Sequence, residues 1–175
     1  MTTDNIAYGT WTALAVTALY DLASDTSDPF GAWQSARVDN QTSEKAIDYE
    51  VGIHILTKTG TIGGDSAAYV YVIPWVYDGS AWLAHGNFGT ITLPTGTDAA
   101  ASISDPNSMK GPYVIPIKIN LQILDGWFTI GQMCGGIVPD GWSIAIRNST
   151  GLTFEDNTPT TNISIAYRKI TFTNA

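Results

Sequence analysis

The stretch from Gly141 to Gly151, GWSIAIRNSTG, alternates between large apolar residues and small or polar ones. The large apolar residues occupy every second position, at Trp142, Ile144 and Ile146. Successive side chains in a strand point to opposite faces, so a period of two predicts a half-buried β-strand. The run ends in Asn148-Ser149-Thr150-Gly151, where residues that tolerate turn geometry predict a turn.

A second stretch near the C-terminus repeats this pattern. Residues 162–172 read NISIAYRKITF, with Ile163, Ile165 and Tyr167 on alternate positions. Two such runs predict an all-β fold. Neither run contains residues that suggest catalysis.

The rest of the chain contains further strand signals at short spacings. The expected strands are Trp33–Asp39, Asp48–Lys58, Ala67–Tyr77, Tyr113–Leu121 and Trp127–Met133. Pro74 predicts an edge or a bulge within its strand. Asp78-Gly79 predicts a hairpin turn that leads to Trp82 and Leu83.

Two segments are less regular. Thr10–Leu22 fits a helical face and a strand equally well, and its Thr, Val, Trp and Tyr content favours a strand. Leu93–Pro112 is rich in small and turn-forming residues, so we expect the longest loop there.

About eight to ten short strands without a long helix predict one antiparallel β-sandwich. We prefer a jelly-roll topology, with an immunoglobulin-like sandwich as the alternative. We expect residues 1–30 to form an N-terminal strand or assembly arm and residues 31–175 to form the sandwich, as a single domain overall.

Charge is scarce in this chain. Charged residues make up 14% of its 175 residues and the net charge is −8, whereas a typical soluble domain has roughly 25% charged residues. The shortage suggests that part of the surface contacts another protein. The eight Lys and Arg residues do not cluster, which argues against binding to nucleic acid or to an anionic membrane. The N-terminus lacks the basic region of a signal peptide, so we expect synthesis in a cytoplasm.

Three acidic or histidine-containing groups are candidates for metal or acid–base sites. Asp48, Glu50 and His54 share one strand face, but Asp48 and His54 are expected roughly 20 Å apart. We interpret them as a solvated face, and His85 as an ordinary histidine without a local partner. Asp21, Asp25 and Asp28 do not match a calcium-loop spacing, nor do Glu155-Asp156-Asn157, so turn chemistry is preferred at both places.

We therefore predict no catalytic residue, no metal site and no cofactor. The glycine-rich segments at Gly60–Gly64 and Gly135-Gly136 lack a following Walker lysine and are read as connections between strands. The single cysteine, Cys134, follows an apolar strand and is expected to be a buried small hydrophobic residue.

Aromatic residues are the more informative group. On the predicted strand Ala67–Tyr77, both faces are apolar, which predicts burial of one face in the core and of the other under a subunit or a long loop. An exposed aromatic row could instead stack against sugars. The candidate interaction residues are Tyr69, Tyr71, Trp75 and Trp82.

Two parts of the chain together resemble a family. They are GAWQSARVDN at 31–40 followed by Asp48-Tyr49-Glu50-Val51, and PDGWSIAIRNSTG at 139–151 with Tyr167-Arg168-Lys169. These stretches resemble small virion proteins of tailed bacteriophages, over most of the chain from about Gly31 onward. The resemblance implies a non-enzymatic sandwich protein, such as a capsid decoration (cement) protein or a small tail component. It also implies that Asp39 and Asn40 cap backbone groups at the end of a strand.

The preferred hypothesis is a decoration protein that binds and stabilises the assembled shell as a homo-oligomer in contact with the major capsid protein, and is therefore found in the virion. Candidate contacts are Met1–Thr12 and Leu93–Pro112. The alternative is a tail-associated or host-surface carbohydrate-binding module that uses Tyr69, Tyr71, Trp75 and Trp82. A jelly-roll enzyme is disfavoured because metal-dependent barrels of this kind need several histidines.

Overall fold

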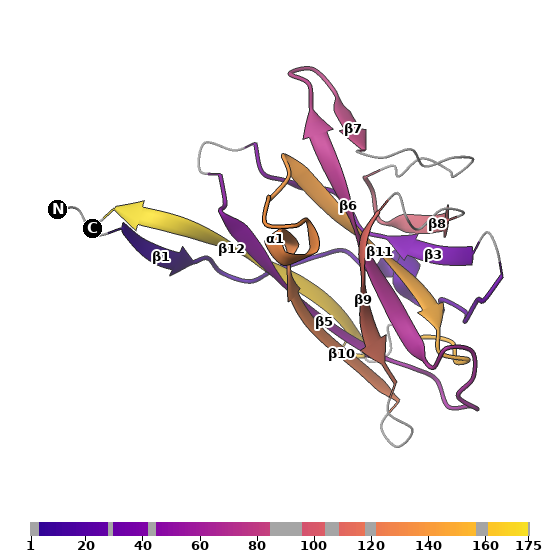
Figure 1. Ribbon diagram of the computed structural model, residues 1–175. Helices are drawn as coiled ribbons and strands as arrows, with labels where there is room; N and C mark the ends of the chain where they lie inside the picture. The colour runs from indigo at the N-terminus through magenta and orange to yellow at the C-terminus, as the bar shows by residue number, and fades with distance from the viewer. Residues whose placement is uncertain are drawn as a thin grey trace.

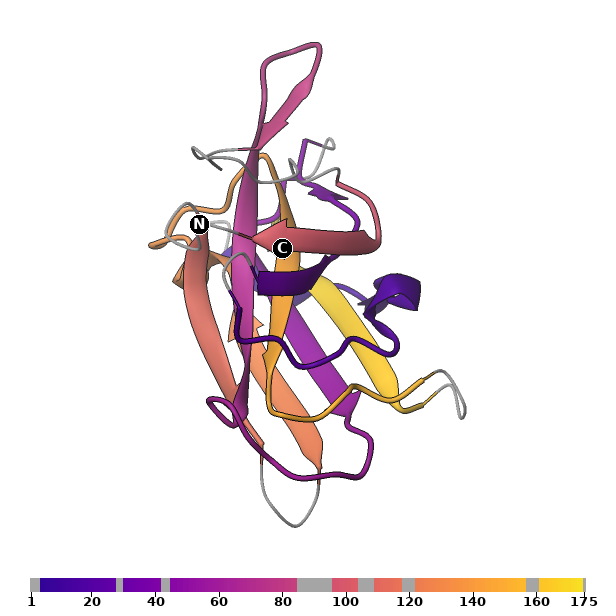
Figure 2. The ribbon, with the colours of Figure 1, turned by 90° about the vertical axis from the view of Figure 1, so that its right-hand side faces the viewer.

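The computed structural model describes residues 4–27, 30–41, 45–84, 96–103, 109–117, 122–156 and 161–174. In this part of the chain, two antiparallel sheets face each other, as predicted for an all-β sandwich (Figures 1 and 2). No helix in the described ranges is long and apolar enough to cross a membrane.

Sheet A has the strand order β1–β12–β5–β10, with β2 also paired to β12. The long strands are β5 (Asp48–Leu56) and β12 (Ile163–Asn174), which pair with each other along most of their length. The shorter strands are β1 (Asp4–Tyr8), β2 (Thr12–Ala13) and β10 (Ile123–Thr129).

Sheet B has the order β7–β6–β11–β3–β8, with β4 paired to β11 and β9 paired to β6. Its centre is formed by β6 (Ala67–Tyr77) and β11 (Gly141–Ser149). The remaining strands are β3 (Phe30–Gln34), β4 (Val38–Asp39), β7 (Trp82–Ala84), β8 (Ala99–Ile103) and β9 (Lys110–Pro116). Figure 2 views the molecule from the side of this sheet.

The chain crosses repeatedly from one sheet to the other. If β1 and β2 are counted as one unit, sheet A has four units in the order β1/β2–β12–β5–β10. Four strands of sheet B form a corresponding row in the order β3–β11–β6–β9. Among these eight units, only β6 and β9 follow each other within one sheet. We interpret this order as a jelly roll, which is built from two Greek keys.

The main core lies between the two sheets. In β5 every second residue is buried, namely Tyr49, Val51, Ile53 and Ile55, as the alternation predicted. They pack with Trp142, Ile144 and Ile146 of β11 and with Ile163 and Ile165 of β12. The two stretches that opened the sequence analysis therefore face each other across the sandwich.

Strand β11 differs from the half-buried strand expected, because it is buried on both faces apart from Arg147. Its second face belongs to a smaller cluster, which contains Ala145, Tyr71, Ile73, Trp75 and Met109. The polar Ser143 is accommodated there because its hydroxyl accepts a hydrogen bond from Trp75 Nε1 at 2.9 Å. Small side chains in β11 thus permit a second apolar layer.

The N-terminal segment is mostly irregular rather than a strand over Thr10–Leu22. It contains β2 and a 3-10 helix over Thr17–Leu19. The Asp98 carboxylate accepts hydrogen bonds from the backbone N–H groups of Thr17 and Ala18 and from Trp33 Nε1, which fixes this helix against sheet B. Leu14, Val16 and Leu19 belong to the main core. Only the start of the predicted 1–30 arm therefore stands apart from the sandwich.

The predicted strand Trp33–Asp39 is interrupted between β3 and β4. The Ser35 hydroxyl takes the place of a strand carbonyl by accepting the Ile144 N–H at 3.0 Å. Beyond it, the Arg37 N–H donates to the Gly96 carbonyl instead of to the ladder. Asp39 and Asn40 cap backbone groups as expected, at Gln41 N and Ala46 N respectively.

Two other boundaries differ from the sequence expectations, and so does the position of Pro74. The predicted loop Leu93–Pro112 contains β8 and the start of β9, although residues 93–95 and 104–108 lie outside the described residues. The predicted strand Trp127–Met133 gives way to a short helix, α1 (Ile130–Met133), which the Thr129 hydroxyl caps by accepting the Gln132 N–H. Pro74 lies in a central strand, at a point where β6 pairs only with β11, between the ends of β9 and β7.

Candidate functional site

The β1–β12 ribbon projects from the body of the sandwich, with the start of β1 and the end of β12 at its tip (Figure 1). Ile6 lies opposite Phe172, and Tyr8 lies opposite Ile170. These four residues share one face because directly paired residues of antiparallel strands point the same way. Ile6, Tyr8 and Phe172 are 58%, 55% and 61% exposed. The ribbon therefore presents an apolar face to solvent.

The opposite face of the ribbon has a different character. It carries Asn5, Ala7, Thr171 and Thr173. A two-stranded ribbon alone is only marginally stable in water. Apolar residues alternate with small or polar ones in β1 and at the end of β12. The apolar face of the ribbon is therefore suited to packing against another surface.

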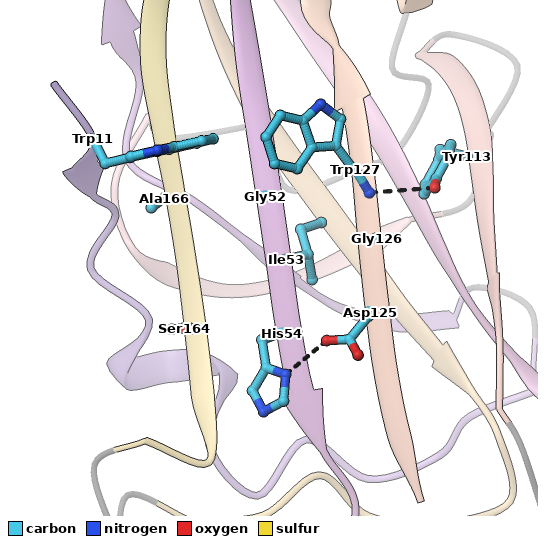
Figure 3. Close-up of a pocket in the computed structure, with 10 residues that line it drawn as sticks. All are labelled: Trp11, Gly52, Ile53, His54, Tyr113, Asp125, Gly126, Trp127, Ser164 and Ala166. Atoms are coloured by element: carbon cyan, nitrogen blue, oxygen red, sulfur yellow. Dashed lines mark hydrogen bonds and ion pairs between the residues drawn. The ribbon is translucent and has the colours of Figure 1, made fainter. Parts of the chain in front are cut away.

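The outer face of sheet A continues from the ribbon into a shallow groove of about 570 Å³. Its floor is nearly free of side-chain atoms, because Gly52 of β5 lies beside Ala166 of β12. Trp127 of β10 pairs with Gly52 from one side, and Trp11 reaches over it from the other, with its ring within 3.9 Å of where a Gly52 Cβ would lie. The two indoles meet edge to face at one end of the groove (Figure 3).

The other end of the groove is polar. His54 Nδ1 lies 2.7 Å from Asp125 Oδ1, and both side chains are exposed to solvent. Ser164 pairs with His54 across β12 and β5 and also lines the groove. In Figure 3 the second ring nitrogen of His54 points away from Asp125, and the His54 side chain is 40% exposed.

Arg168 joins the groove to the ribbon. Its guanidinium lies 4.6 Å from the centroid of the Tyr8 ring and 5.0 Å from that of Trp11. The same side chain forms an ion pair with Glu50 on the neighbouring strand. The ion pair neutralises Glu50, and the guanidinium contacts both aromatic rings.

The four predicted interaction residues lie on sheet B instead. Tyr71 and Trp75 are only 5% and 4% exposed, so neither provides an exposed stacking platform. Tyr69 lies under the Arg147 guanidinium. Trp82 is stacked against Arg37, whose guanidinium lies 4.2 Å from the indole centroid. The second face of β6 is therefore largely covered within the chain itself.

The predicted solvated face of Asp48, Glu50 and His54 is divided among separate partners. Asp48 accepts the Gly131 N–H at 2.7 Å, Glu50 pairs with Arg168, and His54 pairs with Asp125. Within the described ranges, no group of three or more His, Cys, Asp or Glu residues could hold a metal ion. His85 lies outside these ranges.

Asp25 follows the expected turn chemistry. Hydrogen bonds from the Ser27 hydroxyl and from the Gly31 and Ser27 N–H groups lower the pKa of Asp25 to about 2. Asp21 pairs with Lys58 at 2.5 Å. Asp28 and Asn157 lie outside the described residues.

Cys134 is half-buried and follows the short helix α1 rather than a strand. Burial raises the pKa of its thiol to about 11. The thiol is therefore neutral at physiological pH, as expected for a small apolar residue rather than a nucleophile.

Of the residues of this groove, the sequence analysis singled out only His54, and it interpreted His54 as part of a solvated face. Trp11 fell in the ambiguous segment Thr10–Leu22, and Trp127 was counted only as a strand former. The available signal was Gly52, because a glycine inside a strand often marks a close approach by another group.

Comparison of the sequence with protein-family models and with curated proteins finds no match.

Proposed function

We propose that the chain is a non-enzymatic structural protein of a bacteriophage particle, which coats the assembled capsid as a homo-oligomer. The observation that carries this proposal is the projecting β1–β12 ribbon with its apolar face. Such a face in a protein with few charges is suited to permanent contact with another chain.

The charge distribution supports a second copy of this chain as the first partner of the ribbon. The net charge of −8 would oppose contact between most surfaces of two copies. Between Asn5 and Tyr8, and between Ile170 and Thr173, the ribbon carries no charged residue. Ile6 and Phe172 of one copy could therefore pack against the same residues of another in a symmetric contact.

The resemblance to virion proteins gains support from the fold. The longer stretches of the two parts, 31–40 and 139–151, lie side by side in sheet B, where Trp33 pairs with Ile146 and Val38 pairs with Trp142. The shorter stretches, 48–51 and 167–169, pair with each other in sheet A. The two parts thus form one structural unit rather than two unrelated motifs. A decoration protein of this kind would stabilise the shell by binding only the assembled form.

The first experiment measures the molar mass of the purified chain by light scattering. We expect an oligomer for the unaltered chain and a monomer for the double variant Ile6→Ser, Phe172→Ser. The matched control is Ala7→Ser, Thr171→Ser, which alters a directly opposed pair on the other face of the same ribbon and should leave the mass unchanged. A monomeric unaltered chain would overturn the ribbon as a self-association surface.

The second experiment locates the chain in the particle. Cryo-electron microscopy of the phage that encodes it should show copies at regular lattice positions on the outside of the shell. Copies confined to the tail would reject the decoration role. They would favour the alternative of a tail-associated module, although Tyr71 and Trp75 are too buried to be its binding residues.

A further inference from the structure

We propose that the groove on the outer face of sheet A is a binding site for a neutral carbohydrate. One sugar ring would stack on an indole of the Trp11–Trp127 pair, and its hydroxyls would bond to His54, Asp125 and Ser164. This site adjoins the self-association face of the ribbon through Arg168, but its residues are different and the proposal does not depend on self-association.

The floor of the groove is formed by a glycine, although glycine is an unfavourable residue in a strand. Gly52 occupies the middle of β5, a central strand, where glycine is less favourable than residues with a side chain. A Cβ at this position would make ordinary contact with the Trp11 ring at 3.9 Å, and a larger side chain would displace that ring. Glycine therefore keeps the floor of the groove flat and lets the two indoles meet above it.

The aromatic end of the groove is both exposed and held in place. Trp127 is 53% exposed and Trp11 is 43% exposed. Their edge-to-face contact, with ring centroids 5.4 Å apart, restrains each ring before a ligand arrives. In Figure 3 the Trp127 ring is seen face-on over the sheet, whereas the Trp11 ring is seen edge-on. A ring that is already oriented loses less conformational entropy when a flat ligand stacks on it.

The polar end lies at a suitable distance from the aromatic end. His54 and Asp125 are each two residues along their strands from Gly52 and Trp127, and pair with each other as those residues do. Two residues of strand correspond to about 7 Å. The hydroxyls of a sugar ring that stacks on the Trp127 indole would therefore lie within reach of the His54–Asp125 pair.

Charge favours a neutral ligand over an acidic one. Asp125 is 70% exposed at the groove, and the chain as a whole is negative. The nearby Arg168 is already paired with Glu50. A purely apolar ligand would cover His54, Asp125 and Ser164 without bonding to them, which costs free energy. A ligand with apolar ring faces and hydroxyl edges satisfies both ends.

The test uses maltose, lactose and the N-acetylglucosamine disaccharide as neutral probes, with N-acetylneuraminic acid as the anionic probe. Saturation-transfer NMR and tryptophan fluorescence are recorded with each sugar at up to about 10 mM, which detects dissociation constants near the millimolar range. We expect at least one neutral sugar to bind and N-acetylneuraminic acid to bind at least about tenfold more weakly. No binding by any neutral probe would overturn the proposal.

Two variants locate the binding. Trp127→Ala should weaken it at least about tenfold through loss of the stacking surface. Gly52→Val fills the floor and would displace the Trp11 ring, so it should abolish binding. The matched control is Tyr77→Ala, which removes an exposed aromatic residue on sheet B and should bind as the unaltered chain does.

The remaining outcomes also decide the question. Unchanged sugar binding by both Trp127→Ala and Gly52→Val would place the site elsewhere and overturn the proposal. A lower oligomer mass for Gly52→Val would assign the groove to contacts between copies instead. The Ile6→Ser, Phe172→Ser variant should still bind the sugar, so failure of the decoration role and failure of this site can be told apart.

Discussion

The indole rings of Trp11 and Trp127 meet edge to face, with ring centroids 5.4 Å apart and an interplanar angle of 83°. Trp11 precedes β2, which pairs with β12, and Trp127 lies in β10 at the opposite edge of sheet A. The contact crosses β12 and β5, where Ala166 and Gly52 leave the space above the sheet open. Small residues in two central strands thus allow two distant aromatic residues to meet.

This contact should be measurable as a coupling energy. A double-mutant cycle with Trp11→Ala and Trp127→Ala, followed by urea unfolding, should give a coupling free energy of about 0.5–1.5 kcal/mol. We expect the lower half of this range because both rings are partly exposed. The pair Trp11→Ala and Tyr77→Ala, on different sheets, is the control and should be additive. Additivity in the first cycle would show that the two indoles do not interact.

Asn148 should be among the most sensitive polar residues of the chain. Its side chain is fully buried, and Nδ2 donates to the carbonyls of Leu22 and Leu152 at 2.8 and 2.7 Å. Its Oδ1 accepts from the Thr150 hydroxyl at 2.7 Å. Asn148→Ala leaves these groups without partners, so the free energy of unfolding should fall by about 3 kcal/mol.

The control for Asn148 is Asn5→Ala on the exposed ribbon, which should change the free energy of unfolding by no more than about 0.5 kcal/mol. Equal effects of the two substitutions in urea unfolding would contradict the role assigned to Asn148.

β5, β11 and β12 could be predicted from the sequence because large apolar residues recur at every second position in each of them. β5 has four alternate buried residues, and the Asp78-Gly79 turn joins β6 to β7 as expected. The burial of both faces of β11 could not be predicted. Ser143 and Ala145 resemble solvent-facing residues, and only their partners Trp75 and Tyr71 show that they are covered.

The site was less predictable than the fold, for a physical reason. The groove combines residues from β5, β10, β12 and the segment before β2, and their positions depend on strand register. Register is a property of pairing that no single strand reveals. The aromatic row of β6 was the stronger sequence signal, yet the structure buries Tyr71 and Trp75 of that row.

Acid should remove the contribution of Asp25, in the loop that follows Leu22, to the free energy of unfolding. The pKa of Asp25 is lowered to about 2 by the hydroxyl of Ser27 and by backbone N–H groups. A carboxyl whose pKa is lower in the folded state stabilises that state above its unfolded value near 4, and this contribution is lost as the pH falls toward 2. The stability difference between the unaltered chain and Asp25→Ala should therefore be largest at neutral pH and shrink steadily below about pH 4.

Urea unfolding of both chains between pH 7 and pH 2.5 measures this difference. Ser27→Ala provides the control, because it should raise the pKa of Asp25 toward its ordinary value, as read from the carboxyl carbon in NMR titration. A difference that does not change with pH would contradict the assigned hydrogen bonds.

Two glycines with positive φ should respond very differently to alanine. Gly151 has φ +81°, and a Cβ there would lie 2.2 Å from the backbone nitrogen of Gly63. Gly79 has φ +98° in the β6–β7 turn, and nothing lies within 4 Å of its Cβ position. Gly79→Ala should cost only the conformational strain of about 1–2 kcal/mol. Gly151→Ala adds a backbone collision that no side-chain rotation relieves, so it should cost about 3 kcal/mol or more in urea unfolding. Equal costs would mean that the Gly63 and Gly151 loops are not packed against each other.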